Sequence, residues 1–143
     1  MIKLLEQNEI PAVMDLVWQV FSEFEAPEYL PEGVKTFRDF IANEDEINKL
    51  KIYGAFAEDG LAGIIALRGG EHICLFFVRK EHHRQGLGRS LFEFALRDGA
   101  ADKITVNSSP YAVEIYHKLG FADTDTEQVL NGIWFTPMVF EKA

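Results

Sequence analysis

The stretch "FFVRKEHHRQGLGRSLF", residues 76–92, carries the pattern that decides the fold. A run of large apolar residues gives way to basic residues, then to Gly86 and Gly88, and then to apolar residues again. This order predicts a buried strand that passes through a loop into a helix. A helix N-terminus has unpaired backbone N–H groups and a partial positive charge, and glycines there let the main chain approach a phosphate closely. We therefore expect a phosphate-bearing ligand at this loop.

The loop is basic although the chain is acidic. The formal net charge is −9, yet residues 79–89 contain four basic residues against Glu81 alone. An acidic chain is a poor partner for nucleic acid, which binds through clustered Lys and Arg. A short basic segment in an acidic chain indicates binding of a small anionic ligand. The alternative is that these residues are only solvated surface charges.

Length and composition predict one globular domain over residues 1–143. The chain has 143 residues, of which 48% are hydrophobic, enough for a single core. No apolar run approaches the roughly 18 residues that a membrane span needs, and the charged N-terminal residues do not form a secretory signal. One cysteine excludes an internal disulfide, and we expect a cytoplasmic protein without membrane contact.

Hydrophobic periodicity and turn residues predict about seven strands and about four helices. The expected strands are 2–5, three within 51–78 separated by Asp59-Gly60 and Gly69-Gly70, 102–108, and two flanking Asn131-Gly132. The expected helices begin near Asn8, near Val34, at 87–97 and at 109–119, the last with Ser109 as its cap. The hairpin turns make most strand pairs antiparallel. This order predicts an α/β (α+β) sandwich with a mixed, mostly antiparallel sheet.

The glycine loop fits neither common nucleotide-binding pattern. A dinucleotide site needs a third glycine and a parallel unit, whereas hairpin strands precede this loop. A Walker loop needs Gly-Lys-Ser/Thr, which is absent here. Residues 83–88, "HRQGLG", instead resemble the signature of the GNAT superfamily of N-acetyltransferases, Gln/Arg-x-x-Gly-x-Gly/Ala, with His83 as a departure at the first position. The stretch "VNSSPYAVEIYHKLGF" adds to the resemblance, which covers nearly the whole chain.

The resemblance implies a single acyl-CoA N-acyltransferase domain with acetyl-CoA as co-substrate. The loop would hold the diphosphate of acetyl-CoA, and the implied loop residues are Arg84, Gln85, Gly86, Leu87, Gly88 and Arg89. Phe77 and Val78 would offer main-chain hydrogen bonds to the pantetheine arm, in a slot between two splayed strands. Asn107 matches a position that contacts the same arm.

Tyr116 matches the family tyrosine that serves as general acid toward the coenzyme A thiolate. A phenol with a pKa near 10 keeps its proton at neutral pH and can give it to departing sulfur. A purely packing role for Tyr116 remains the alternative. His72 is a candidate general base because of its ordinary pKa, and Glu25 and Glu28 are further candidates. The neighbouring histidines His82 and His83 lack metal-ligand spacing, so no metal is expected.

The region after the first helix would form the acceptor side. Glu23, Glu25, Glu28 and Glu32 would form an acidic rim that attracts cationic amines, with a solvated polar loop as the alternative. Phe24, Tyr29 and Leu30 would instead shape an apolar pocket. We expect an N-acetyltransferase that acts on a primary amine, of a small molecule or of a protein, by direct attack in a ternary complex. The rival function is an acyl-CoA-binding sensor without transfer activity. A homodimer is left open, since dimers are common among such proteins.

Overall fold

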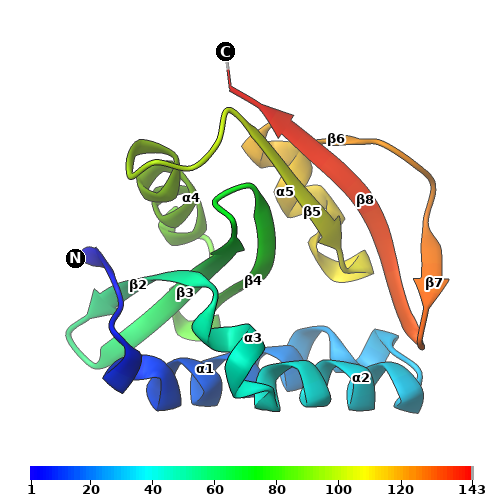
Figure 1. The fold of residues 1–143 in the computed structure, drawn as a ribbon, viewed down its shortest axis with the longest axis horizontal. Helices are drawn as coiled ribbons and strands as arrows, with labels where there is room; N and C mark the ends of the chain where they lie inside the picture. The colour runs from blue at the N-terminus through cyan, green and yellow to red at the C-terminus, as the bar shows by residue number, and fades with distance from the viewer. Residues whose placement is uncertain (143) are drawn as a thin grey trace.

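The computed structural model describes residues 1–142 of the chain. This part contains eight strands and five α-helices (Figure 1). The strands are β1 (Ile2–Leu4), β2 (Lys51–Ala57), β3 (Gly60–Arg68), β4 (His72–Val78), β5 (Lys103–Ser108), β6 (Ala122–Asp123), β7 (Gln128–Leu130) and β8 (Ile133–Glu141). Their order in the sheet is β1-β2-β3-β4-β5-β8-β6, and β7 pairs with β8. Only β4 and β5 pair in parallel among these strands. The predicted mixed, mostly antiparallel sheet is confirmed.

Helices cover both faces of the sheet (Figure 1). They are α1 (Ile10–Phe24), α2 (Pro31–Ala42), α3 (Glu44–Asn48), α4 (Leu87–Arg97) and α5 (Val113–Leu119). Short 3-10 turns precede several of them, at Gln7–Glu9, Ala26–Glu28, Lys80–His82 and Pro110–Ala112. Asn8 was predicted to cap the first helix, and that prediction is wrong, because Asn8 lies within the 3-10 turn that precedes α1. Glu6 and Glu9 instead form a capping box around the turn that leads into α1.

Two hydrophobic cores lie on opposite faces because side chains alternate along each strand. In β3, Ile64 and Ala66 pack in the core that α1 supplies, together with Phe77 of β4. The neighbouring residues Ile65 and Leu67 pack in the other core, with residues of α4 and α5. The central strands are therefore covered on both sides, as the continuous apolar run of 73–78 predicts.

The sheet splits between β4 and β5. The two strands pair only at His72↔Thr105 and Ile73↔Val106, although β4 continues to Val78 and β5 to Ser108. Cys74 has no partner in β3, because the β3–β4 register shifts between Ala66 and Leu67. This extra residue is a β-bulge, which bends the bulged strand and ends regular pairing. The bulge lies directly after the last β4–β5 pair, so it marks the start of an open slot.

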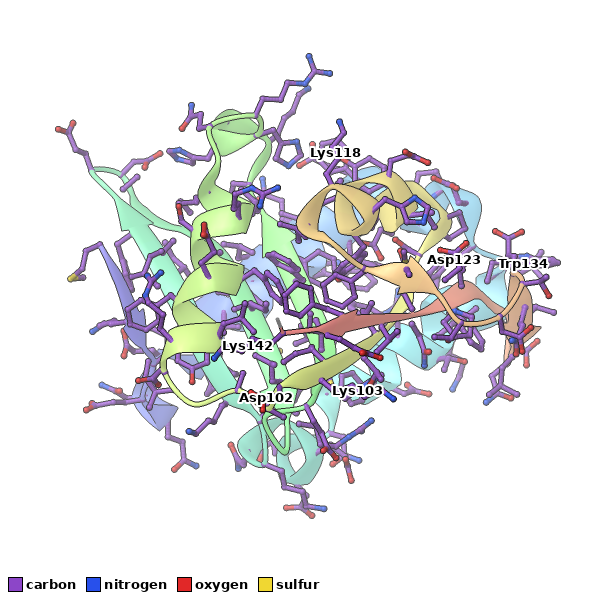
Figure 2. The ribbon with its side chains drawn as sticks, turned by 90° about the horizontal axis from the view of Figure 1, so that it is seen from above. Asp102, Lys103, Lys118, Asp123, Trp134 and Lys142 are labelled. Atoms are coloured by element: carbon purple, nitrogen blue, oxygen red, sulfur yellow. The ribbon has the colours of Figure 1, made fainter. Side chains whose placement is uncertain are left out.

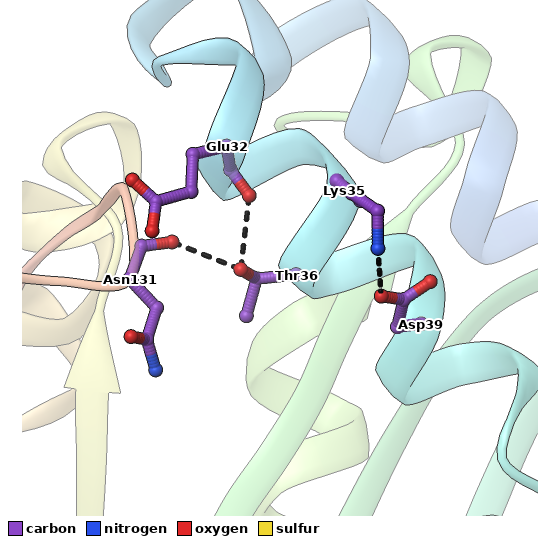
Figure 3. A network of polar contacts seen from close by, with 5 residues as sticks. All are labelled: Glu32, Lys35, Thr36, Asp39 and Asn131. Atoms are coloured by element: carbon purple, nitrogen blue, oxygen red, sulfur yellow. Dashed lines mark hydrogen bonds and ion pairs between the residues drawn. The ribbon is translucent and has the colours of Figure 1, made fainter.

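The C-terminal hairpin docks on α2 (Figure 3). A Cβ atom added at Gly33 would lie 2.1 Å from the Gly132 carbonyl oxygen, so the two main chains touch. The Thr36 hydroxyl lies 2.9 Å from both the Glu32 and the Asn131 carbonyl oxygens. This contact joins the helices of the first part of the chain to the strands beyond the slot.

The two ends of β8 differ in character. Asp102, Lys103 and Lys142 lie together at its C-terminal end, and Trp134 lies near its N-terminal end, where β8 pairs with β7 (Figure 2). The Lys142 N–H donates to the Asp102 carbonyl at 2.7 Å, which closes the β5–β8 pair at this charged end. Within residues 1–142, no helix is both long enough and apolar enough to cross a bilayer.

Candidate active site

The slot between β4 and β5 opens into a cavity of about 160 Å³. Residues from both faces of the split sheet line it: Glu25, Tyr29, Phe37, Ile73, Cys74, Phe76, Phe77, Val106, Asn107, Ser109, Ala112, Tyr116 and Ile133. The β4–β5 split therefore connects the side covered by α1 and α2 with the side covered by α5. Five of the predicted site residues come together here: Glu25, Tyr29, Phe77, Asn107 and Tyr116.

The main chain of β4 presents an unpaired edge to the slot. The Arg79 N–H donates to the Ala62 carbonyl of β3 at 2.8 Å, and main-chain groups alternate between the two sides of a strand. The N–H groups of Phe76 and Val78 therefore face the slot, whereas that of Phe77 faces β3. The predicted edge is present at Val78. Phe77 lines the cavity with its side chain, and the N–H that faces the slot beside that of Val78 belongs to Phe76 and not, as the sequence suggested, to Phe77.

His83 contacts this edge. Its Nε2 atom lies 2.7 Å from the Val78 carbonyl oxygen and donates to it, and its ring lies 4.9 Å from the Phe24 ring. His83 stands where the family signature has Gln or Arg. The structure gives it a position between α1 and the end of β4, which the sequence did not indicate.

The loop before α4 combines left-handed backbone conformations with unpaired N–H groups at the start of the helix. Arg84 and Gly86 both have positive φ, 62° and 77°. No atom lies within 4 Å of a Cβ built at Gly86, so this loop has an open face. The first intrahelical bond here runs from the Ser90 N–H to the Gly86 carbonyl, which leaves the preceding N–H groups of the first turn without helical acceptors. The 11 residues of α4 place the positive end of the helix dipole at the same point.

The side chains of this loop have different partners. Arg84 is exposed, and Gln85 donates through Nε2 to the Glu81 carbonyl at 3.3 Å. The Arg89 guanidinium donates to the Lys118 carbonyl at the end of α5, at 2.7 Å. Arg84 is thus the side chain available to an anion, whereas Arg89 holds α4 and α5 together.

Leu87 and Gly88 form the first turn of α4. Leu87 packs against the core beneath the helix. A Cβ added at Gly88 would lie 3.7 Å from the Phe76 ring, an ordinary contact distance. An alanine would therefore fit at Gly88, whereas Gly86 adopts the left-handed conformation that begins the helix.

Tyr116 is buried, with 6% of its surface exposed. Its ring packs edge-on against Phe76 at 5.9 Å and Phe121 at 5.2 Å. Burial raises the pKa of its hydroxyl well above the ordinary value, and the charge of Glu25 and then Tyr29 add to the shift. The hydroxyl consequently stays protonated at neutral pH, as a proton donor must.

Glu25 supplies the only carboxylate among the lining residues. Burial raises its pKa from the ordinary 4.5 to about 7, the nearby Ser109 hydroxyl opposes the rise, and the charge of Glu28 adds to it. Glu28 itself is exposed and outside the lining. A carboxyl group with a pKa near 7 can accept a proton and release it again at neutral pH.

Ser109 was expected to cap the last helix, and that prediction is wrong. Its side chain makes no capping hydrogen bond. The residue is 7% exposed, and its Oγ atom has no hydrogen-bond partner within residues 1–142. A buried hydroxyl without a partner is costly, and this residue belongs to the cavity lining beside Glu25.

His72 lies away from these groups, at the closed end of the slot. Its Nδ1 atom is 2.8 Å from the Thr105 hydroxyl, and it is not among the lining residues. Burial lowers the pKa of His72. The structure therefore brings Glu25, not His72, next to Tyr116.

Cys74 lines the cavity, but its chemistry is that of a neutral thiol. Burial raises its pKa, and a protonated thiol is a weak nucleophile. Among residues 1–142, no group of three or more His, Cys, Asp or Glu side chains is placed to hold a metal ion.

Comparison with known proteins identifies the family. No curated protein sequence matches the chain. The sequence model described as "Acetyltransferase (GNAT) domain" matches residues 25–142. The chain belongs to the GNAT acetyltransferase family.

Solved structures share the fold of this GNAT domain. The PaiA N-acetyltransferase of Thermoplasma acidophilum, in complex with coenzyme A, superposes with a TM-score of 0.78 at 17% identity, covering 99% of this chain and 98% of that one. A GCN5-related N-acetyltransferase of Rhodopseudomonas palustris gives 0.75 at 18% identity, with 99% and 94% covered. A Bacillus subtilis acetyltransferase in complex with CoA gives 0.62 at 21% identity, with 99% and 98% covered. At these identities the likeness concerns the fold.

Proposed function

We propose that this GNAT domain transfers the acetyl group of acetyl-CoA to a primary amine by direct attack in a ternary complex. The observation that carries the proposal is the cavity at the β4–β5 split, where an open strand edge, a buried neutral phenol and a carboxyl group of pKa about 7 meet. These are the groups that an acyl transfer from a thioester to an amine needs.

The residues present fit acetyl-CoA as the co-substrate. The outward N–H groups of Phe76 and Val78 suit the amides of the pantetheine arm, which would extend the sheet as an added strand. The open face at Gly86 and the N–H groups of Leu87, Gly88 and Arg89 suit the diphosphate. Arg84, exposed beside them, suits a further phosphate oxygen, and Asn107 lies in the lining where the arm would end.

Glu25 acts as the general base in this proposal. A primary ammonium group, with a pKa near 10 like that of lysine, must lose a proton before its nitrogen can attack. Glu25 takes this proton directly or through one water and later releases it to solvent. Its raised pKa brings the carboxylate closer in basicity to the ammonium group than an ordinary glutamate is.

Tyr116 acts as the general acid. As the C–N bond forms, the C–S bond breaks and sulfur leaves with a negative charge. Tyr116 donates its hydroxyl proton to this sulfur, and the surplus proton on the attacking nitrogen restores the phenol. The main-chain N–H groups facing the slot stabilise the negative charge that develops on the carbonyl oxygen.

An acyl-CoA sensor without transfer activity is the rival function. Both functions predict that coenzyme A raises the thermal stability of the domain. Only the transferase releases free thiol from acetyl-CoA in proportion to an added amine. Coenzyme A binding without amine-dependent thiol release across a broad panel of amines would support the sensor and contradict the proposal.

A further inference from the structure

The acceptor side of the cavity is built by four residues from three segments. Glu25 and Tyr29 come from the connection between α1 and α2, Phe37 from α2, and Ile133 from the start of β8. We refer to these four residues as the acceptor wall. Tyr29 and Phe37 pack in the core on the α1–α2 face of the sheet, whereas Tyr116 packs in the core on the other face.

The acceptor wall is held in place by packing and by main-chain contact. The Phe37 ring stacks on Phe21 at 3.9 Å, and the Tyr29 ring meets Phe21 edge-on at 5.3 Å. Ile133 follows Gly132, whose main chain touches that of Gly33. Contacts from the α1–α2 region and from the C-terminal hairpin thus hold the acceptor wall in a defined shape. A binding surface of defined shape can select among ligands.

Among residues 1–142, those that line the cavity include one acidic residue and no basic one. Of the residues that line it, Glu25 alone carries a charge near neutral pH, and none is Lys, Arg or His. Tyr29 and Tyr116 stay neutral because burial raises the pKa of both hydroxyls. An ammonium group finds a counter-charge here. A carboxylate or phosphate would be buried without one, which is strongly unfavourable.

The cavity is also small. Its volume of about 160 Å³ is comparable to an engineered cavity of about 150 Å³ that holds one benzene molecule. Part of this space must receive the acetyl group and the end of the pantetheine arm. The remaining space suits a short apolar chain or ring.

We propose that the acceptor is a small primary monoamine with an uncharged, apolar body, and that the acceptor wall excludes amines that carry a carboxylate beside the nitrogen. The proposal rests on the transferase function proposed above and narrows it. It excludes free amino acids as good acceptors. It also disfavours short diamines, whose second ammonium group would enter a cavity with a single carboxylate.

A matched set of four amines tests the proposal through free-thiol release from acetyl-CoA. Butylamine is the reference, norvaline is butylamine with an added carboxylate, norvaline amide controls for size, and putrescine adds a second ammonium group. We expect kcat/KM for butylamine to exceed that for norvaline by about 100-fold or more, because the carboxylate loses its hydration without a partner. Norvaline amide should fall within about 10-fold of butylamine, and putrescine should fall below it.

A charge introduced into the wall provides a second test. Ile133→Lys places an ammonium group at the acceptor wall, and Ile133→Met is the control of similar length without charge. The quantity measured is kcat/KM for norvaline divided by kcat/KM for norvaline amide. The lysine variant should raise this ratio by about 10-fold or more, and the methionine variant should leave it near the wild-type value. Because a ratio is measured, partial loss of folded enzyme does not affect it.

The outcomes separate this proposal from the proposed function. If norvaline is acetylated as well as norvaline amide, or putrescine better than butylamine, the inference about the acceptor is wrong while the transferase function stands. If none of these amines nor any in a broader panel releases thiol, the transferase function fails and the acceptor proposal fails with it.

Discussion

Glu25 and Tyr116 line one cavity from elements about 90 residues apart. Burial raises the pKa of the Tyr116 hydroxyl, and the charge of Glu25 adds to the rise. The phenol therefore stays protonated at neutral pH, while the carboxyl group of Glu25, with a pKa of about 7, can exchange a proton. Two groups in one site with widely separated pKa values are typical of an acid–base pair.

Tyr116→Phe removes the proposed acid and keeps the ring that packs on Phe76 and Phe121. We expect kcat to fall by about 10²-fold or more, with coenzyme A affinity unchanged within about 2-fold. Free-thiol release and calorimetric titration with coenzyme A measure the two quantities. Turnover equal to wild type would assign Tyr116 to packing alone.

Glu25→Gln keeps the shape of the side chain and removes the base. In the wild type, kcat/KM should rise with pH and level off above an apparent pKa near 7, because the carboxylate is the active form. The variant should lose this rise as well as most of its activity. His72→Gln is the matched control, since His72 lies at the closed end of the slot. A rise near pH 7 that disappears in His72→Gln and persists in Glu25→Gln would reverse the assignment.

Stability should also depend on Glu25. Its folded-state pKa of about 7 exceeds the ordinary 4.5, so between these values the folded protein binds the proton that the unfolded chain has lost. The contribution of Glu25 is thus most favourable below pH 4.5 and is lost as the pH rises through 7, by roughly 3 kcal/mol at most.

Glu25→Gln removes this pH dependence. The free energy of unfolding of the variant should exceed that of wild type at pH 8, and the difference should shrink toward pH 4.5. Denaturant titrations at the two pH values measure it. A difference that is the same at both pH values would show that Glu25 has no raised pKa.

Gly86→Asp places a negative charge where the diphosphate is proposed to bind and forces a non-glycine residue into φ 77°. Coenzyme A affinity should fall by about 10-fold or more. Gly88→Ala is the control, because its Cβ would sit 3.7 Å from Phe76 in ordinary contact, and it should bind within about 3-fold of wild type. Titration calorimetry measures both, and equal affinity for the aspartate variant and wild type would argue against the cradle.

Gly33→Ala tests the contact between α2 and the C-terminal hairpin. The added methyl group would lie 2.1 Å from the Gly132 carbonyl oxygen, so the hairpin must move. We expect a loss of about 1–3 kcal/mol in stability and a raised KM for the amine, because Ile133 of the acceptor wall follows Gly132. An unchanged melting temperature would contradict the close main-chain contact between Gly33 and Gly132.

Local signals in the sequence predict most of the fold. The helix 87–97 has the predicted bounds, because Gly86 adopts the left-handed conformation that begins it. The Asn131-Gly132 turn is also present, with positive φ at both residues. Strand β6 was not predicted, since two residues carry no periodic pattern and its pairing with β8 is a tertiary contact.

The sequence predicts the candidate site less well than it predicts the fold. Glu25 was one of several candidate bases, and only the three-dimensional arrangement separates it from His72 and Glu28. The direction in which the slot opens depends on the bulge at Cys74, which no local pattern reveals. Ser109 resembles a helix cap in sequence, but its hydroxyl is buried and makes no capping hydrogen bond.

The decisive measurement is a structure of the domain with coenzyme A bound. We expect the pantetheine arm in the β4–β5 slot, hydrogen-bonded to the main chain of Val78, with the diphosphate on the N–H groups of Leu87, Gly88 and Arg89 and the sulfur beside Tyr116. Coenzyme A bound elsewhere, or in the slot with its sulfur remote from Tyr116, would contradict it.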